Sequence, residues 1–172
     1  YGKTKLAGEQ AILNSDLEKY LIVRTSWLYG PGGNNFVETI LRLAAEREEL
    51  RIISDQVGSP TYTADLADAI FRLLAASASP QPPATSPSGL YHFANEGSCS
   101  WYEFAKEIVA VARQSGISLA VNNILPIKTV EYPLPATRPA YSVFDKSKYK
   151  QSVGKEIPEW QASLGEYFTI RN

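Results

Sequence analysis

The first five residues, Tyr1-Gly2-Lys3-Thr4-Lys5, place a tyrosine and a lysine four positions apart. In a helix this spacing puts both side chains on one face, one turn apart. The lysine ammonium would stabilise the phenolate, so the tyrosine could donate or accept a proton at low cost. Such pairs are common on ordinary helix surfaces, so the spacing alone indicates an acid–base site only weakly. The chain contains no methionine, and we expect it to be the carboxyl-terminal piece of a longer protein.

The residues that follow predict the elements that would hold this pair in place. Leucine, isoleucine and small residues recur after Lys5, which predicts a helix with a mostly apolar, closely packed stripe and with Glu9 facing outward. Leu21-Ile22-Val23 predicts a buried strand, and the segment 24–33 that follows it is rich in glycine. Ligands bind at the carboxyl ends of strands in open α/β sheets, so we expect a binding site there.

Two stretches, 1–9 and 24–30, resemble the extended short-chain dehydrogenase/reductase superfamily and, more narrowly, the dTDP-4-dehydrorhamnose reductase family. Further motifs occur in the order of that family and with similar gaps. They are Asn34-Asn35-Phe36, the loop 54–61, the segment Gly89-Leu90-Tyr91-His92-Phe93-Ala94-Asn95 and Arg138-Pro139-Ala140-Tyr141-Ser142. Together these motifs run through nearly the whole chain, so the ordered set is a far more specific signal than any one of them.

The resemblance implies an α/β fold: the carboxyl-terminal part of a doubly wound Rossmann-type domain, interleaved over residues 1–172 with a small α+β substrate-binding lobe. It also implies NADPH or NADH as the cofactor, bound mainly by an amino-terminal half that is absent here. The fingerprint Gly-x-Gly-x-x-Gly does not occur in the chain. We therefore expect reduction of dTDP-4-dehydro-L-rhamnose to dTDP-L-rhamnose from the longer protein, as a step in polysaccharide biosynthesis, and no activity from the fragment alone.

The resemblance also implies roles for the residues near the cofactor. Ketone reduction needs a hydride from one side and a proton for the developing alkoxide. Tyr1 would donate that proton, while Lys5 would lower the pKa of Tyr1 and hydrogen-bond the nicotinamide ribose. Thr25 and Ser26 would lie near the nicotinamide. The serine or threonine that polarises the carbonyl in similar enzymes would lie upstream.

Other residues would contact the substrate. By resemblance Trp27 lies against the sugar ring, although a plug at the edge of the core would also explain it. Asn34 and Asn35 open a helix whose free N–H groups suit an anion or a pyrimidine, and a simple N-cap explains them equally well. Arg138 would reach the diphosphate bidentately, with a surface salt bridge as the alternative. Further polar contacts are expected at Gln56 and Thr61.

Composition and charge narrow the class of protein. The 172 residues are 44% hydrophobic, enough for one sizeable core, and the net charge of −1 gives no basic surface for nucleic acid or an anionic membrane. No apolar run approaches the ~18 residues of a membrane span, and no signal peptide is visible. The single cysteine, Cys99, excludes an intrachain disulfide and suits a cytoplasmic protein. His92 is expected to be structural, and no metal ligand is assigned, although relatives are often homodimers and sometimes hold a divalent ion.

The rest of the sequence alternates between helical and strand patterns. Helices are predicted from Asn34 or Asn35 to about Glu48, from a cap at Thr63, from a capping box at Ser100 and Glu103 to about Gln114, and from Pro158 onward. Strands are predicted at 51–53, 90–93 and 123–128, with an irregular loop through Pro60, a surface connection at 77–88 and a proline-containing loop at 127–138.

Two other functions fit the same residues. An epimerase or dehydratase of the same superfamily shares the Tyr-x-x-x-Lys pattern, and the acidic groups that a dehydratase needs would also lie upstream. A non-catalytic regulatory subunit of this fold would bind a partner enzyme instead. The presence of Tyr1, Lys5 and Trp27 argues against the second alternative, because a scaffold would not need them.

Overall fold

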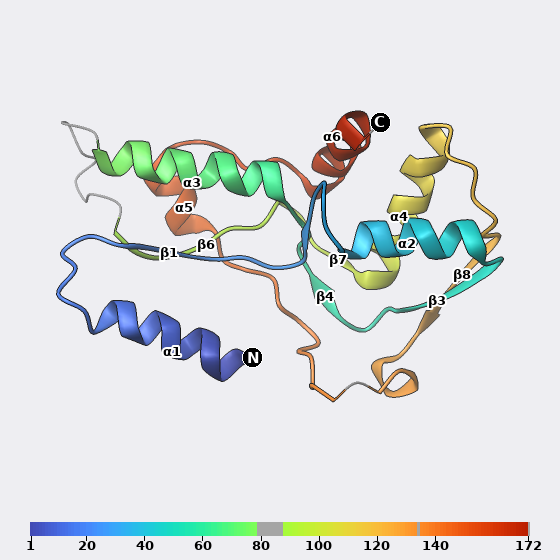
Figure 1. The fold of residues 1–172 in the computed structure, drawn as a ribbon, viewed down its shortest axis with the longest axis horizontal. Coiled ribbons are helices and arrows are strands. Elements are labelled where there is room, and N and C mark those ends of the chain that lie inside the picture. The colour runs from blue at the N-terminus through green and yellow to red at the C-terminus, as the bar shows by residue number, and fades with distance from the viewer. Residues whose placement is uncertain (79–87, 134, 172) are drawn as a thin grey trace.

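The computed structural model describes residues 1–78, 88–133 and 135–171 (Figure 1). Its helices are α1 (Gly2–Leu13), α2 (Phe36–Glu46), α3 (Thr63–Ala78), α4 (Trp101–Gln114), α5 (Ser147–Val153) and α6 (Trp160–Arg171), with a 3-10 turn at Thr129–Glu131. Its strands are β1 (Leu21–Arg24), β2 (Leu28–Tyr29), β3 (Glu49–Ile53), β4 (Val57–Gly58), β5 (Thr61–Tyr62), β6 (Gly89–His92), β7 (Cys99–Ser100) and β8 (Asn123–Ile127).

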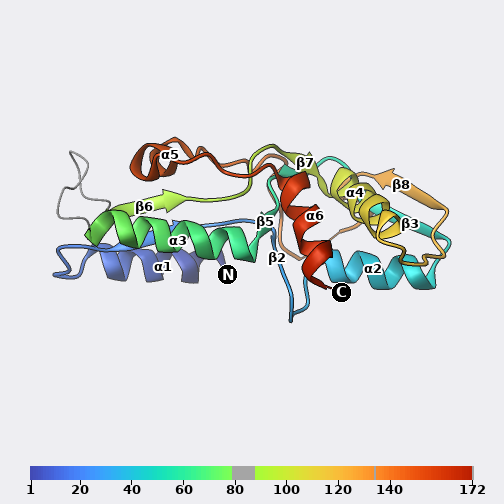
Figure 2. The same cartoon turned by 90° about the horizontal axis from the view of Figure 1, so that it is seen from above.

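The molecule is elongated, with groups of elements at its two ends (Figure 1). We call the group formed by α1, α3, α5, β1 and β6 the β1/β6 lobe, and the group formed by α2, α4, β3 and β8 the α4 lobe. Within the β1/β6 lobe, α3 and α5 lie on one side of the strand pair and α1 lies on the other (Figure 1), while Figure 2 shows the same elements from above. The segment after β1 and the segment after β6 both run from the first lobe to the second, so the chain passes between the lobes repeatedly.

Short strand pairs run through the two lobes. β1 pairs with β6 in parallel, from Leu21 opposite Gly89 to Arg24 opposite His92, and β3 pairs with β8 in parallel. Between them lie the parallel pair β2–β5 and the antiparallel pair β4–β7. Parallel strands need a crossover, and the connection from β1 to β6 contains α3. Both strands run in the same direction and end at Arg24 and His92. These carboxyl ends point toward the α4 lobe (Figure 1).

Most of the predicted elements are confirmed. The capping box is present: Ser100 Oγ accepts from the Glu103 N–H at 3.1 Å, and Glu103 Oε2 accepts from the Ser100 N–H at 2.7 Å. Thr63 is the first residue of α3 rather than its cap, and α6 begins at Trp160, after the predicted Pro158. The sequence analysis missed α5 and the short strand β4 inside the irregular loop. Of the predicted surface connection at 77–88, residues 79–87 lie outside the described part of the chain.

The prediction of a closely packed stripe on α1 is wrong for this chain. None of the residues of α1 is buried, and Leu6 and Leu13 are each about half exposed. Glu9, predicted to face outward, instead accepts hydrogen bonds from the Arg24 guanidinium at 2.8 and 2.5 Å. The apolar residues of α1 are spread around the helix, so no single face can bury them all against β1.

Two apolar clusters form the core. The larger one fills the α4 lobe between α2, α4 and α6, and includes the buried aromatic residues Tyr29, Phe104 and Tyr167. The smaller one joins α3 to β6 and α5 through Leu73, Phe93 and neighbouring side chains. The fully buried Asn95 follows β6 by three residues, and its amide donates to Asp65 in α3 and to Ser163 in α6.

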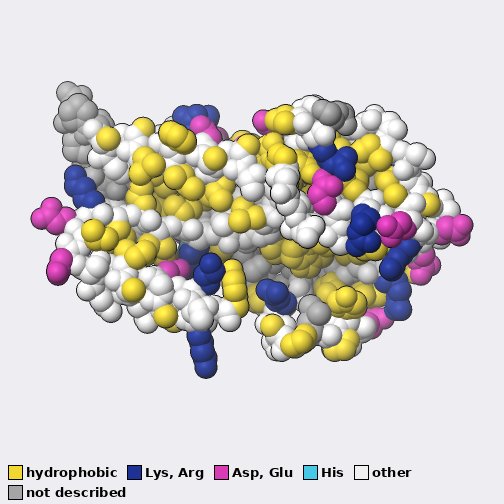
Figure 3. Space-filling model, viewed as in Figure 1, with side chains coloured by type: hydrophobic (Ala, Val, Ile, Leu, Met, Phe, Trp, Pro, Cys, Tyr) yellow, Lys and Arg dark blue, Asp and Glu magenta, His cyan; other side chains and the backbone are white. Residues whose placement is uncertain are grey.

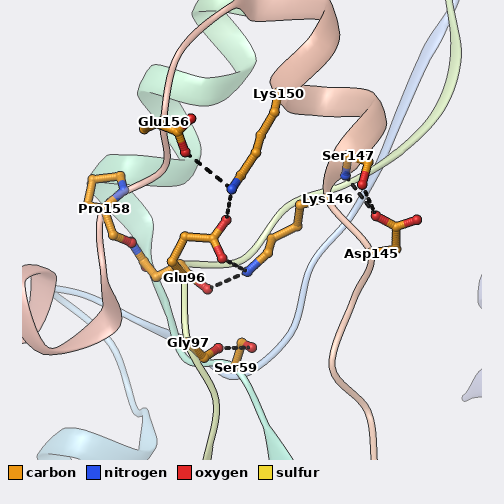
Figure 4. Close-up of polar contacts among 10 residues, drawn as sticks. Ser59, Glu96, Gly97, Asp145, Lys146, Ser147, Lys150, Glu156 and Pro158 are labelled. Carbon is orange, nitrogen blue, oxygen red and sulfur yellow. Dashed lines mark hydrogen bonds and ion pairs between the residues drawn. The ribbon is translucent and has the colours of Figure 1, made fainter.

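A cluster of charges attaches α5 to the end of β6 (Figure 4). The ammonium of Lys146, only 7% exposed, contacts Glu96 Oε2 at 3.0 Å and donates to the Asn95 carbonyl at 3.0 Å. Lys150 contacts the other oxygen of Glu96 at 2.8 Å and the exposed Glu156 at 3.3 Å. Burial raises the pKa of Glu96, but hydrogen bonds from Lys150 and Lys146 outweigh it and lower that pKa below its ordinary value.

We expect Glu96→Gln to lower the free energy of unfolding by roughly 1–3 kcal/mol, because the buried Lys146 ammonium loses its counter-charge. Urea denaturation at neutral pH measures this change. A glutamate with a lowered pKa stabilises the fold at neutral pH, and the stabilisation is lost as the pH falls through the lowered pKa. The difference between the two proteins should therefore shrink in acid.

Glu156→Gln is the matched control, because Glu156 is 88% exposed and contacts only Lys150 in this cluster. Its free energy of unfolding should stay close to that of the wild type. Equal losses in the two variants would contradict the assignment of Glu96 as the buried partner of Lys146.

Candidate active site

A cleft of about 970 Å³ opens in the α4 lobe, between α2 and β3 on one side and the segments 127–132 and 138–142 on the other. Hydrophobic side chains gather in this hollow (Figure 3). The aromatic residues of its wall are Trp27, Phe36, Trp101 and Tyr132, and its arginines are Arg47, Arg51 and Arg138. Flat apolar faces beside guanidinium groups suit a ligand that combines rings with negative charge.

Trp27 stands at the base of this wall, in the segment after β1. Its backbone has φ of 47°, in the left-handed region, and it is the sole non-glycine residue with a positive φ in the described ranges. The indole stacks on that of Trp101 with ring centroids 3.5 Å apart and planes 13° apart. A bulky residue held in a left-handed conformation is typical of functional sites, where the surrounding structure maintains the strain.

Thr25 and Ser26, predicted to lie near a nicotinamide, are hydrogen-bonded to the segment before α3. Thr25 Oγ1 contacts Thr61 Oγ1 at 3.3 Å, and Ser26 Oγ donates to the Ser59 carbonyl at 2.9 Å. Thr61, predicted to contact the substrate, is fully buried and lies behind Thr25. Its structural effect is to fix the Thr25 side chain, and its N–H also donates to the Trp27 carbonyl at 3.2 Å.

Gln56 lies on the cleft wall, with its amide turned toward the segment beyond β8. The side chain is 6% exposed, and its Nε2 donates to Thr129 Oγ1 at 3.0 Å. Asp55 accepts from the Thr129 N–H and hydroxyl at 3.0 and 2.7 Å, and this hydroxyl lowers the pKa of Asp55. Both side chains therefore hold the far wall of the cleft in place.

Asn35 is the N-cap of α2, as the simpler of the two interpretations predicted. Its Oδ1 accepts from the Glu38 N–H at 3.1 Å, and its Nδ2 donates to the carbonyls of Gly30 and Gly33 at 2.9 and 3.2 Å. Asn34, its neighbour, is exposed. The amide of Asn35 thus ties the glycine-rich loop to the helix.

Arg138 is exposed and lies on the cleft wall beside Pro139. Arg51, on the same wall, forms an ion pair with Glu131 at 3.1 Å. None of the ion pairs found in the described residues involves Arg138, so the surface salt bridge considered as the alternative does not form there.

Tyr1 and Lys5 lie together at the start of α1 and are not among the residues that line the cleft. The Lys5 ammonium is 5.5 Å from the centroid of the Tyr1 ring, which is 91% exposed. The predicted helical juxtaposition is therefore present. The structure brings Trp27, Gln56 and Arg138 together around one cleft, and Thr25 together with Thr61, but Tyr1 and Lys5 form a separate pair.

The sequence analysis missed several residues of the cleft wall. Trp101 was assigned only to the start of a helix, because it follows the capping-box serine. Arg47 and Arg51 flank the start of β3 and carry no motif. Two tryptophans, one directly after a strand and one at the start of a helix, could have been paired as neighbours in one aromatic wall, and this pairing would have indicated Trp101.

The chain spans about half the length of the curated relatives it matches. Over residues 1–171 it matches the family described as RmlD substrate binding domain, and it belongs to that family. It is 44% identical over 172 residues to a spore coat polysaccharide biosynthesis protein, SpsK, of Bacillus subtilis, covering all of this chain and 54% of the relative. It is 43% identical over 173 residues to dTDP-4-dehydrorhamnose reductase of Escherichia coli, covering 98% of this chain and 56% of the relative.

Solved structures agree with this relationship. The crystal structure of dTDP-4-dehydrorhamnose reductase from Bacillus anthracis in complex with NADP has a TM-score of 0.84 and 44% identity, over all of this chain and 55% of that one. The crystal structure of a dTDP-4-dehydrorhamnose reductase from Clostridium acetobutylicum has a TM-score of 0.83 and 40% identity, over 99% of this chain and 55% of that one. A UDP-N-acetylglucosamine 4-epimerase from Bacillus cereus, at 20% identity, shares the fold alone. The α/β fold is thus that of extended short-chain dehydrogenase/reductase enzymes.

We expect Asn35→Ala to lower the free energy of unfolding by about 1 kcal/mol, because α2 loses its cap. Asn34→Ala, a matched change at the exposed neighbour, should leave it nearly unchanged. Thermal unfolding of the two variants measures both effects. Equal stability of the Asn35 variant and the wild type would contradict a capping role.

Proposed function

We propose that the chain is the substrate-binding part of a dTDP-4-dehydrorhamnose reductase, an NADPH- or NADH-dependent enzyme of nucleotide-sugar and polysaccharide biosynthesis. The observation that carries the proposal is the cleft, whose aromatic and arginine wall lies in a chain that belongs to the RmlD substrate-binding domain family. Relatives named as this reductase, and a homologue bound to NADP, support the proposal.

The cleft has a surface for each part of a dTDP-sugar. Trp27, stacked on Trp101, offers a flat face to the sugar ring, and Phe36 adds a further aromatic side chain to the cleft wall. Arg138, which forms no ion pair with any residue that the structure describes, suits the diphosphate, because planar guanidinium groups bind phosphate oxygens bidentately. At about 970 Å³ the cleft lies in the upper range of small-molecule sites, as a nucleotide sugar requires.

Tyr1 and Lys5 fit the proton-transfer half of the reaction. Both are exposed, and no hydrogen bond or ion pair within the described residues occupies the Tyr1 hydroxyl or the Lys5 ammonium. Tyr1 would donate the proton to the developing alkoxide, and Lys5 would stabilise the resulting phenolate and hold the cofactor ribose. When bound, the nicotinamide supplies the hydride. We also propose a cytoplasmic location and a homodimeric assembly, which rest on the resemblance alone.

The two alternatives make different predictions for the same protein. An epimerase would interconvert dTDP-sugars without net consumption of cofactor. A regulatory subunit would bind a partner enzyme and show no turnover. The reductase proposal requires stoichiometric oxidation of NADPH or NADH with dTDP-4-dehydro-L-rhamnose, in a protein that joins this chain to a dinucleotide-binding half. Absence of cofactor oxidation there would contradict it.

We expect Arg138→Ala to weaken dTDP binding by roughly 10–100-fold, because a charge-assisted hydrogen bond contributes about 1.5–3 kcal/mol. Isothermal titration calorimetry of the chain with dTDP measures this loss, and the wild-type affinity should fall as salt rises. Arg42→Ala is the matched control, since Arg42 pairs with Glu46 on the exposed side of α2 and does not line the cleft. Equal affinities for the two variants would contradict the diphosphate contact.

We expect Tyr1→Phe to reduce turnover by roughly 10²–10⁴-fold in the protein that carries the dinucleotide-binding half, because the proton donor is lost. Cofactor oxidation under saturating substrate measures the effect, and dTDP binding should stay unchanged. Lys3→Ala, a change at an exposed lysine of the same helix, is the control and should keep full turnover. Unchanged turnover in the Tyr1 variant would remove Tyr1 as the proton donor.

A further inference from the structure

The stack of Trp27 on Trp101 is closer than an ordinary aromatic contact. Its centroid separation of 3.5 Å lies below the usual range of about 4.5–7 Å, and its planes are almost parallel. Ring quadrupoles disfavour such a face-to-face arrangement, so the surrounding structure must impose it. Phe36 lies 4.5 Å from the Trp101 ring and supports it from α2.

Gly58 also lies directly against the Trp27 indole. A Cβ atom at this position would lie 2.7 and 2.8 Å from Cε2 and Cζ2 of Trp27, and 2.9 Å from Ser142 Oγ. Contacts this short do not occur, so any side chain at position 58 must displace the indole or Ser142. The backbone dihedral of Gly58 is not in the left-handed region. Its lack of a side chain is therefore required by the neighbouring indole rather than by its own conformation.

The backbone around Gly58 cannot easily move away to make room. On one side, β4 pairs with β7, directly before Trp101. On the other side, the Val57 N–H donates to the Ala140 carbonyl at 2.8 Å, and the Ser142 N–H donates to the Val57 carbonyl at 2.9 Å. The residue before Gly58 is thus hydrogen-bonded to the segment that carries Arg138, and the slot for the indole has a fixed width.

We propose that Trp101 and Gly58 are positioning residues that hold the Trp27 indole in the orientation needed to contact the sugar of a bound dTDP-sugar. This inference rests on the proposed function. It adds to that function a role for Trp101 and Gly58 in recognition of the sugar. The Trp101 ring stacks on the indole, the bare backbone of Gly58 leaves room for its six-membered ring, and the indole lines the cleft. The left-handed backbone conformation of Trp27 is a strain that accompanies this orientation of its indole.

Gly58→Ala tests this role by calorimetric titration of the chain with dTDP-L-rhamnose and, separately, with dTDP. We expect about a tenfold weaker affinity for dTDP-L-rhamnose, equivalent to about 1.4 kcal/mol. The affinity for dTDP should stay within about twofold, since the variant leaves the diphosphate contact intact. Gly165→Ala is the matched control, because a Cβ there meets no atom within 4 Å. It should bind both ligands as the wild type does.

Variants of Trp101 provide a second route if Gly58→Ala destabilises the fold, which thermal unfolding detects. Trp101→Ala should lose affinity for dTDP-L-rhamnose, while Trp101→Phe keeps a flat ring and should recover most of it. Two closely stacked indoles also give an exciton-coupled circular dichroism signal without any ligand. We expect this signal in the wild type, and its loss in Gly58→Ala and in both Trp101 variants.

The outcomes separate the inference from the function on which it rests. A Gly58→Ala protein that binds dTDP-L-rhamnose as the wild type does, or that keeps the exciton signal, would overturn the positioning role and leave the proposed function standing. A wild-type chain that binds neither dTDP nor dTDP-L-rhamnose would instead overturn the proposed function, and the inference with it.

Discussion

The side-chain amide of Asn95 is the contact on which the arrangement of the two lobes depends. It is fully buried, accepts from the Tyr62 N–H at 2.8 Å, and donates to Asp65 at 2.6 Å and to Ser163 at 2.8 Å. These partners belong to β5, α3 and α6, so one amide joins α3 of the β1/β6 lobe to α6, which packs against α4 in the larger apolar cluster. An apolar residue here would leave the Tyr62 N–H without its acceptor and would remove one of the two donors to the half-buried Asp65 carboxylate, which also accepts from the Ser163 hydroxyl.

The position of the cleft follows from that junction. Thr61 and Tyr62 form β5, so the contact that fixes Tyr62 to Asn95 also fixes the neighbouring N–H that binds the Trp27 carbonyl. From there the indole reaches into the α4 lobe and stacks on Trp101. A residue that follows a strand of one lobe thus becomes part of a wall in the other.

Elements with a complete local signal could be predicted from the sequence, as the capping box at Ser100 shows. The buried stripe expected on α1 was wrong, because the apolar residues of α1 are spread around the helix and define no single face. The cleft shows the same division. Trp27 and Arg138 stand within motifs and were predicted, whereas Gly58 acquires its importance from contact with Trp27 and Ser142, both distant in sequence. Such constraints exist only after the strands have paired, so no single-segment pattern contains them.

The central claim is that the cleft walled by Trp27 and Trp101 binds a dTDP-sugar, and the tryptophan indoles test it most directly. The chain has three tryptophans, and the third, Trp160, is buried in the core of the α4 lobe and does not line the cleft. The chain is labelled with ¹⁵N and titrated with dTDP-L-rhamnose, and the indole N–H signals are followed by NMR. The signals of Trp27 and Trp101 should shift, and the signal of Trp160 should stay in place. Unchanged signals at Trp27 and Trp101, at saturating ligand, would contradict the account.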